Sequence, residues 1–233
     1  MKIKIAHLYY DLLNLYGEQG NVLALKKALE AQKVKVEVSL LSIGDKIEFD
    51  KYDIFYMGMG TEENLSLVIE DIKNYAKEIE SVIKKGKYFI ATGNSYELFG
   101  QFIEMNGQKY QTLDIFDYHS KANPKRIAGA SFLQFKDLSP IIGFQNRLCC
   151  TINEKNHLFK LIDGYADNSG SEYEGYHEKN FFGTHQVGPI FIRNPHLTDY
   201  IVKDIVGKKY KPRKEDIQYQ AYSEYIKNFY EKS

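Results

Sequence analysis

The chain has 233 residues, of which 43% are hydrophobic and 27% charged, an ordinary composition for a globular protein with one sizeable core. Basic and acidic residues each total 31, so the formal net charge is zero and no basic block favours a nucleic-acid partner. The N-terminus lacks the apolar stretch of a signal peptide, and no apolar run approaches the roughly 20 residues that cross a bilayer. We therefore expect a cytoplasmic globular protein with neither a nucleic-acid partner nor membrane insertion.

The first hundred residues alternate between strand and helix patterns. Asn21 is placed to cap a helix, and residues 61–86 form a long amphipathic helical pattern that ends at Gly86. Strand patterns occupy residues 2–7, 34–43, 52–60 and 87–92. This alternation predicts parallel pairing within an α/β sheet.

After Gly107 the pattern changes to short alternating segments separated by Gly, Asn and Pro. Residues 126–135 and 180–192 predict antiparallel additions and hairpins, so the sheet should be mixed. A helix should begin near Pro195, and a last amphipathic helix occupies 214–233, with Ile217, Ala221, Tyr225 and Phe229 in line. The predicted organisation is one domain over residues 1–207, with an amphipathic helical segment, 208–233, packed on it or extending it.

The stretch KYFIATGNSYELFG, residues 87–100, has the outline of a nucleophile elbow: a strand, a tight turn and the start of a helix. The bend carries no thiol. Because ligand sites in such sheets lie beyond the carboxyl ends of the strands, the turns after DIFYM and KYFIA should be neighbours. The backbone N–H groups of Gly58, Met59 and Gly60 would then face Gly93, Asn94 and Ser95.

Several motifs between residues 5 and 205 occur in a fixed order, and they include LYYDLLNLYGEQGNVLAL, DIFYMGMGTEEN, KRIAG and GTHQVGPIFIRNPHLTDYI. These motifs resemble the class I glutamine amidotransferases of the cobyric acid synthase type, and more narrowly the GatD-like glutaminase subunits of lipid II isoglutaminyl synthase. The resemblance implies a three-layer α/β fold, with a mostly parallel central sheet, antiparallel additions and helices on both faces. It also implies a Mur-ligase-like (MurT-like) partner and no cofactor.

The two residues that carry the family's chemistry are replaced. The family elbow reads Cys-Gly-Gly-Tyr-Gln-Leu-Leu-Gly, and laid on GNSYELFG its cysteine falls on Gly93. The late motif Gly-Thr-Tyr-Leu-His-Gly-Pro, laid on GTHQVGP, puts the histidine on Val187. The resemblance therefore implies a noncatalytic or regulatory subunit that docks on an amide ligase in cell-wall precursor amidation.

One alternative is an active amidohydrolase with rearranged residues. Ser95 and His185 lie near the two replaced positions and could form a new pair, although Ser95 more simply caps the helix that follows. Cys149 or Cys150 with His157 is a weaker pair, because the adjacent cysteines suit a structural role in or beside a strand. No histidine spacing predicts a metal site.

A second alternative is a module that binds glutamine or a related amino acid without chemistry. Arg126 matches a family arginine that holds the substrate, and a guanidinium can bind a carboxylate through two parallel bonds, although a solvated loop arginine fits equally well. The candidate binding residues are Arg126, Gly58, Met59, Gly60 and Asn94. The acidic residues are expected to be solvated; they are Asp11, Glu18, Glu62, Glu63 and Glu174.

Overall fold

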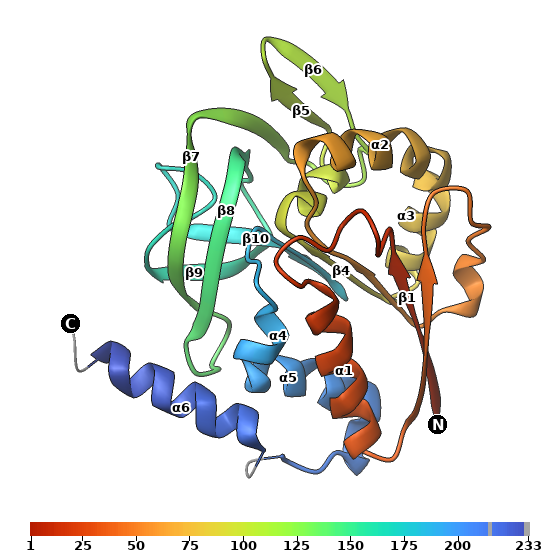
Figure 1. The fold of residues 1–233 in the computed structure, drawn as a ribbon, viewed down its shortest axis with the longest axis vertical. Helices are drawn as coiled ribbons and strands as arrows, with labels where there is room; N and C mark the ends of the chain where they lie inside the picture. The colour runs from red at the N-terminus through yellow and green to blue at the C-terminus, as the bar shows by residue number, and fades with distance from the viewer. Residues whose placement is uncertain (214–215, 231–233) are drawn as a thin grey trace.

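The computed structural model describes residues 1–213 and 216–230 and shows a mixed sheet with helices on both faces (Figure 1). The strands are β1 (Lys2–Leu8), β2 (Lys35–Leu41), β3 (Ile54–Met57), β4 (Tyr88–Thr92), β5 (Phe102–Met105), β6 (Gln108–Gln111), β7 (His119–Gln134), β8 (Ile141–Ile152), β9 (His157–Asp163), β10 (Tyr173–Glu178) and β11 (Phe181–Thr184). The α-helices are α1 (Gln19–Ala31), α2 (Glu62–Ile72), α3 (Ala76–Lys84), α4 (Ile190–Arg193), α5 (Pro195–Val206) and α6 (Ile217–Tyr230). The 3₁₀ helices are η1 (Phe49–Lys51), η2 (Lys73–Tyr75), η3 (Gly93–Phe99) and η4 (Gly207–Lys209).

The strand order is β2–β1–β3–β4–β11–β10–β9–β7–β5–β6, with β8 paired to β7. The pairs from β2 to β11 are parallel, those from β11 through β9 to β7 are antiparallel, and β7 and β8 form a long antiparallel hairpin. The predicted mixed, mostly parallel sheet is confirmed in its central strands. One expectation is corrected: β11 is not merely a hairpin strand, because it also pairs in parallel with β4.

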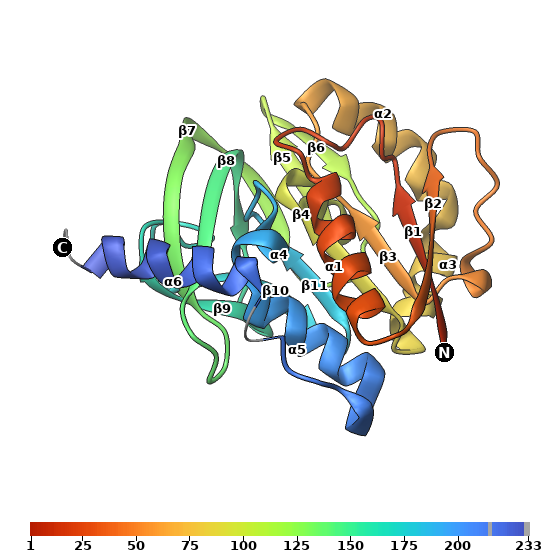
Figure 2. The same ribbon diagram turned by 60° about the horizontal axis from the view of Figure 1, so that its bottom comes forward.

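Two apolar layers hold the sheet between helices (Figure 2). Helices α2 and α3 cover the face that carries Phe55 and Phe89, whose rings stack with centroids 5.3 Å apart. Helices α1 and α5 cover the opposite face, where Ile54 and Ile90 are buried. The parallel strands are thus buried on both faces, which explains why β3 and β4 read as continuous apolar runs rather than alternating ones.

Local predictions at helix ends needed three corrections. Helix α1 begins at Gln19, so Asn21 lies inside it rather than at its cap. The predicted helix over 61–86 is divided by η2 into α2 and α3. Ser95 does not cap an α-helix, because the segment after β4 is the 3₁₀ helix η3. Gly86, with φ +78°, does follow the end of α3, where the left-handed conformation favours glycine.

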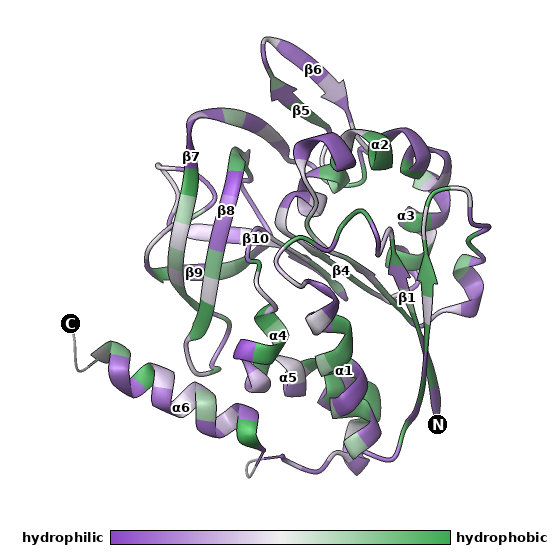
Figure 3. Cartoon of the chain, in the orientation of Figure 1, coloured by the Kyte–Doolittle hydropathy of each residue, from purple (hydrophilic) through white to green (hydrophobic). Residues whose placement is uncertain are grey.

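Helix α6 lies beside β7 and β8 and apart from the parallel strands (Figure 1), and hydrophilic and hydrophobic residues alternate along it (Figure 3). Phe229 stacks on Phe132 with centroids 3.7 Å apart, and the Tyr222 hydroxyl donates to the Pro140 carbonyl at 2.6 Å. Ile217, predicted on the apolar face, is 76% exposed and does not join this contact. Residues 214–215 and 231–233 of the predicted helix lie outside the described residues. Across the described chain, no helix combines the length and apolar character needed to span a membrane.

Candidate functional site

The predicted elbow forms at the carboxyl end of β4. All five residues of β4 are buried, and the chain turns directly into η3 at Gly93, whose φ is +65°. A residue with a Cβ is strained in this region, whereas glycine adopts it freely. The Ser95 hydroxyl sits between two strand ends, donating to the carbonyls of Met57 at 3.1 Å and Thr92 at 3.0 Å.

No room is left for a side chain at position 93. A Cβ built on Gly93 would lie 2.4 Å from the Met59 Cβ and 3.0 Å from the Val187 Cγ1. The fold therefore brings together Gly93 and Val187, the two positions at which the resemblance led us to expect the family's nucleophile and base. Here they carry a hydrogen atom and an isopropyl group. Met59 and Val187 are 3% and 1% exposed, so an apolar contact fills the bend.

The turn after β3 is joined to the elbow by a pair of hydrogen bonds. The Asn94 side chain accepts from the Gly60 N–H at 3.1 Å and donates to the Gly60 carbonyl at 2.9 Å. The two turns are neighbours, as expected from the parallel strands. The hydrogen-bonding capacity of the Gly60 N–H is consequently taken up by the Asn94 side chain within the protein.

Gly58 and Gly60 also make room for the loop that precedes α1. A Cβ on Gly58 would lie 2.3 Å from the Leu13 carbonyl oxygen, and one on Gly60 would lie 2.7 Å from the Leu12 carbonyl oxygen. The Leu15 N–H donates to the Met59 carbonyl at 2.8 Å. The glycines of this turn are explained by close packing of two backbones.

Beneath the elbow lies a carboxylate that was expected in solvent. Glu18 is fully buried and accepts hydrogen bonds from the Tyr56 hydroxyl at 2.8 Å, the Gly188 N–H at 2.9 Å and the Thr92 hydroxyl. Burial raises the pKa of Glu18, and these hydrogen bonds oppose the rise. Asn21, predicted as a helix cap, instead donates to Tyr56 at 2.7 Å. The buried network connects α1, two sheet strands and the loop that carries Val187.

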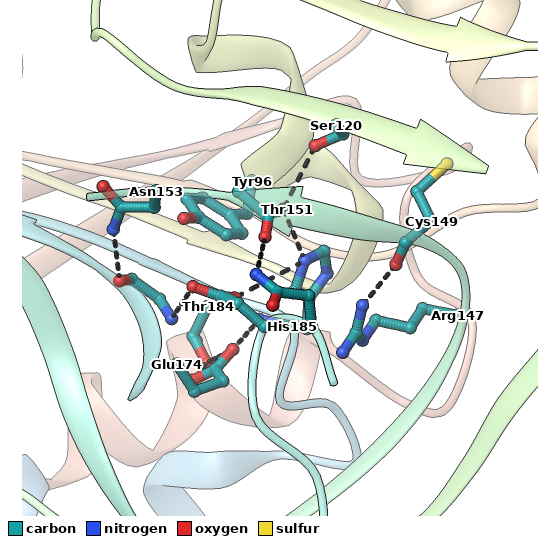
Figure 4. A network of polar contacts seen from close by, with 12 residues as sticks. Tyr96, Ser120, Arg147, Cys149, Thr151, Asn153, Glu174, Thr184 and His185 are labelled. Carbon is teal, nitrogen blue, oxygen red and sulfur yellow. Dashed lines mark hydrogen bonds and ion pairs between the residues drawn. The ribbon is translucent and has the colours of Figure 1, made fainter. Parts of the chain in front are cut away.

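His185 belongs to a second buried network (Figure 4). It is fully buried; its imidazole Nε2 lies 2.8 Å from the Thr151 hydroxyl, and its backbone N–H donates to the Glu174 carboxylate at 2.6 Å. Asp167 lies 3.9 Å from the same ring nitrogen, and Tyr96 packs edge-on with centroids 5.0 Å apart. These contacts direct His185 to the β8 and β10 side of the elbow, whereas the Ser95 hydroxyl bonds to backbone carbonyls, as given above. The structure describes no hydrogen bond between the two.

Arg147 provides the guanidinium of this second network. It is 1% exposed, and it donates to the Gln145 side chain at 2.6 Å, to the Ala166 carbonyl at 2.5 Å and to the Cys149 carbonyl. Its donors are therefore directed at uncharged oxygen atoms of β8 and the segment before β10. A buried arginine with such partners supplies positive potential to its surroundings without being tied to one carboxylate.

Three buried carboxyl groups lie in the field of this arginine. Burial raises the pKa of Glu97 to about 7 and that of Glu174 to about 7, and burial together with the Glu174 charge raises the pKa of Asp167. Burial and the Arg147 charge lower the pKa of His185 well below its ordinary value, so its imidazole is neutral. Glu174, expected in solvent, is thus wholly interior.

The cysteines occupy the structural position that the sequence favoured. Cys149 is 5% exposed, and burial followed by the Glu97 charge raises the pKa of its thiol, which disfavours the reactive thiolate. His157 stacks on Tyr173 with centroids 4.4 Å apart and pairs with the Asn153 amide. The structure describes no contact between His157 and either cysteine.

Arg126 lies in a polar chain that joins three parts of the fold. Its guanidinium forms an ion pair with Glu62 in the first turn of α2, and it donates to the Asn146 side chain at 3.2 Å. Asn146 in turn donates to the Tyr16 hydroxyl at 2.5 Å. Arg126 and Glu62 are 43% and 42% exposed. The half-exposed guanidinium suits a solvated loop arginine. Its ion pair with Glu62, which lines a cavity beside the elbow, suits a residue of a binding site.

A cavity of about 90 Å³ lies beside the elbow, between α2, η3, the β5–β6 hairpin and β8. Met59, Asn94 and Glu97 contribute to it from the two turns. Sequence reasoning did not single out Glu97 or Arg147. The available signal was the elbow motif itself, in which the family has a neutral glutamine at the position of Glu97.

Comparisons of the sequence with known proteins identify relatives of this chain. A model of the CobB/CobQ-like glutamine amidotransferase domain matches residues 4–195. The chain is 28% identical to the lipid II isoglutaminyl synthase (glutamine-hydrolyzing) subunit GatD of Staphylococcus aureus, over 89% of this chain and 86% of that protein. It is 29% identical to the subunit GatD of Streptococcus pneumoniae, over 97% of this chain and 87% of that protein.

Solved structures support the fold. PurLQS from Thermotoga maritima aligns with a TM-score of 0.56 and 15% identity, over 97% of this chain and 100% of that one. A crystal structure of a glutamine amidotransferase aligns with a TM-score of 0.57 and 13% identity, over 87% of this chain and 98% of that one. With a family model that spans most of its length, the chain belongs to the CobB/CobQ-like glutamine amidotransferase family.

Proposed function

We propose that this chain is a catalytically silent GatD-like subunit, which docks on a Mur-ligase-like amide ligase in cell-wall precursor amidation. Its GatD relatives are named as subunits of a glutamine-hydrolyzing synthase of lipid II. The observation that carries the proposal is the elbow, where Gly93 faces Val187 and Met59 fills the intervening space.

The chemistry of amide hydrolysis explains why we propose a noncatalytic subunit. Amide hydrolysis by the family route needs a nucleophile at the bend and a base beside it, and removing either typically reduces turnover about a millionfold. A hydrogen atom and an isopropyl group supply neither function. Docking on a ligase needs a folded surface and neither a nucleophile nor a base, so the retained fold is sufficient for it.

The alternative hydrolase would need Ser95 and His185 to act together. The Ser95 hydroxyl is bonded to two backbone carbonyls, and the imidazole of His185 contacts Thr151. No observation favours this alternative over the silent subunit. It makes a separate prediction, however, because Ser95→Ala would then abolish glutamate release.

The test uses the full chain copurified with its ligase. Amidation of the precursor is measured with glutamine or with ammonium chloride as the nitrogen source, and glutamate release is measured in the same samples. We expect amidation with ammonium and none with glutamine, together with a stable complex of the two proteins. Glutamine-dependent amidation without any other amidotransferase present would contradict the proposal.

A further inference from the structure

Four lysines gather at the end of the molecule opposite the elbow. The elbow lies at the carboxyl end of β4, whereas Lys33 lies in the turn between α1 and β2, and Lys208, Lys209 and Lys211 follow α5. Both segments lie at the amino ends of the parallel strands, where the chain after α5 passes the end of α1 (Figures 1 and 2). We call Lys33, Lys208, Lys209 and Lys211 the basic patch.

The fold holds the two segments of the basic patch together. The Gln32 side chain donates to the Lys211 carbonyl at 2.9 Å and accepts from the Lys211 N–H at 2.8 Å. Tyr210 packs against the apolar layer that α1 and α5 share. Because Tyr210 packs inward, its neighbours Lys209 and Lys211 remain at the surface, where both are exposed.

The ammonium groups of the basic patch lack acidic partners. All four lysines are exposed, and within residues 1–213 and 216–230 none of their ammonium groups forms an ion pair or a hydrogen bond. Of the nearby acids, Glu30 faces Lys26 at 3.9 Å, and Asp204 accepts from the Tyr88 hydroxyl at 2.5 Å. Even with the full charge of Asp204 counted, the basic patch keeps a positive excess. The whole chain has no net charge, so this excess is local.

An anionic lipid surface fits this arrangement better than a nucleic acid does. Lysines near a negatively charged membrane strengthen binding by roughly fivefold each. Nucleic-acid sites instead rely on arginine forks and on exposed aromatic rings that stack with bases. Arg213 is tied to Asp199 at 2.7 Å and to Asp216 at 3.0 Å. Tyr210, the aromatic residue beside the lysines, is turned inward and offers no stacking face.

We propose that the basic patch docks this subunit on the anionic phospholipid surface of a membrane, without insertion into the bilayer. The inference rests on the proposed function, since the precursor named for the GatD relatives is a lipid, which a membrane holds. Four lysines give reversible binding that salt weakens. Docking at this end leaves the elbow facing away from the bilayer.

Flotation of the full chain with lipid vesicles tests the docking. One set of vesicles contains one-third phosphatidylglycerol, and the other contains phosphatidylcholine alone. We expect at least tenfold tighter binding to the anionic vesicles. Raising the salt from 0.1 M to 1 M should weaken that binding at least tenfold, because the Debye length falls from about 10 Å to about 3 Å. A short single-stranded RNA at the same phosphate concentration should bind more weakly than the anionic vesicles.

A matched pair of variants locates the surface. Lys208→Gln combined with Lys209→Gln should weaken binding to anionic vesicles at least tenfold. Lys77→Gln combined with Lys160→Gln removes the same charge from exposed positions outside the basic patch and should bind like the parent. Thermal melts check that each variant is folded, and each preparation is assayed for glutamate release from glutamine.

The inference is wrong if the folded parent binds anionic and neutral vesicles equally, if the RNA binds more tightly than the anionic vesicles, or if the two double variants bind alike. These outcomes leave the silent elbow untouched as long as no glutamate is released. Glutamate release, by contrast, would refute the proposed function whatever the vesicles show.

Discussion

The bend at Gly93 and the charged cluster around Arg147 lie side by side, yet they are built in opposite ways. At the bend, Met59 and Val187 meet a glycine and bury only apolar atoms. In the cluster, an arginine, a histidine and three carboxyl groups are buried together. An apolar contact needs no partner, whereas each buried charge depends on the others. This difference predicts that substitutions in the charged cluster cost more stability than substitutions at the bend.

The largest expected effect comes from breaking the charged cluster. Arg147→Met should lower the free energy of unfolding at pH 7.5 by about 3–5 kcal/mol, because it leaves buried carboxyl groups without their cation. Urea unfolding followed by circular dichroism measures the loss. Arg126→Met is the matched control, since that arginine is 43% exposed and should cost far less. A loss below about 1 kcal/mol for Arg147→Met would show that the cluster does not depend on this charge.

A second prediction concerns the pH dependence of the same cluster. Folding raises the pKa of Glu97 from 4.5 to about 7, so the native state binds more protons than the unfolded chain between these values. The stability that this group contributes is fully present below pH 4.5 and is lost as the pH rises through 7.

Glu97→Gln removes that loss. Relative to the parent, the variant should gain up to about 3 kcal/mol in unfolding free energy between pH 4.5 and pH 8. Because His185 is present in both proteins, its own opposing pH dependence largely cancels in the difference. Denaturant titrations at four pH values provide the measurement, with Glu63→Gln as the control. A difference that is constant with pH would contradict the prediction.

The third prediction probes the sealed bend. Gly93→Ala should destabilise the protein by about 1–3 kcal/mol, because its Cβ meets Met59 and its φ of +65° is unfavourable for alanine. Met59→Gly removes the opposing side chain. In a double-mutant cycle, the combined loss should be smaller than the sum of the single losses, whereas simple additivity would mean that the two side chains do not compete for space.

The smallest effect is expected at the rim of the cavity. The ion pair between Glu62 and Arg126 is exposed, so a double-mutant cycle with Glu62→Gln and Arg126→Met should give a coupling below about 1 kcal/mol. Raising the salt concentration to 1 M should reduce the coupling further. A coupling well above 1 kcal/mol that persists in high salt would show that this pair is more than a solvated contact.

The backbone of the elbow could be predicted from sequence, because its determinants are local. A run of apolar residues predicts β4, glycine at 93 suits its positive φ, and parallel strands require the two turns to meet. Matching two motifs to the family pattern singled out Gly93 and Val187, and the structure adds that the two lie together. The parallel contact between β11 and β4 was missed, since a short alternating strand does not specify its second neighbour.

The buried charges were harder to predict. Glu18 and Glu174 look like ordinary loop acids in sequence, and their burial depends on tertiary donors: Gly188 is far along the chain from Glu18, and Thr184 is brought to Glu174 by the pairing of β10 with β11. Asn21 fitted the residue preference of a helix cap, but a tertiary bond to Tyr56 determined its role. Tertiary partners determine whether such polar residues are buried, and local sequence patterns do not identify those partners.

Covalent capture tests the silent elbow most directly. The full chain, with and without its ligase, is incubated with a diazoketone analogue of glutamine that alkylates the nucleophile of a working glutaminase, and the intact mass is measured. The account predicts an unchanged mass, because Gly93 has no side chain and burial keeps the Cys149 thiol protonated. A stoichiometric adduct on Ser95 or on either cysteine, blocked by added glutamine, would contradict it.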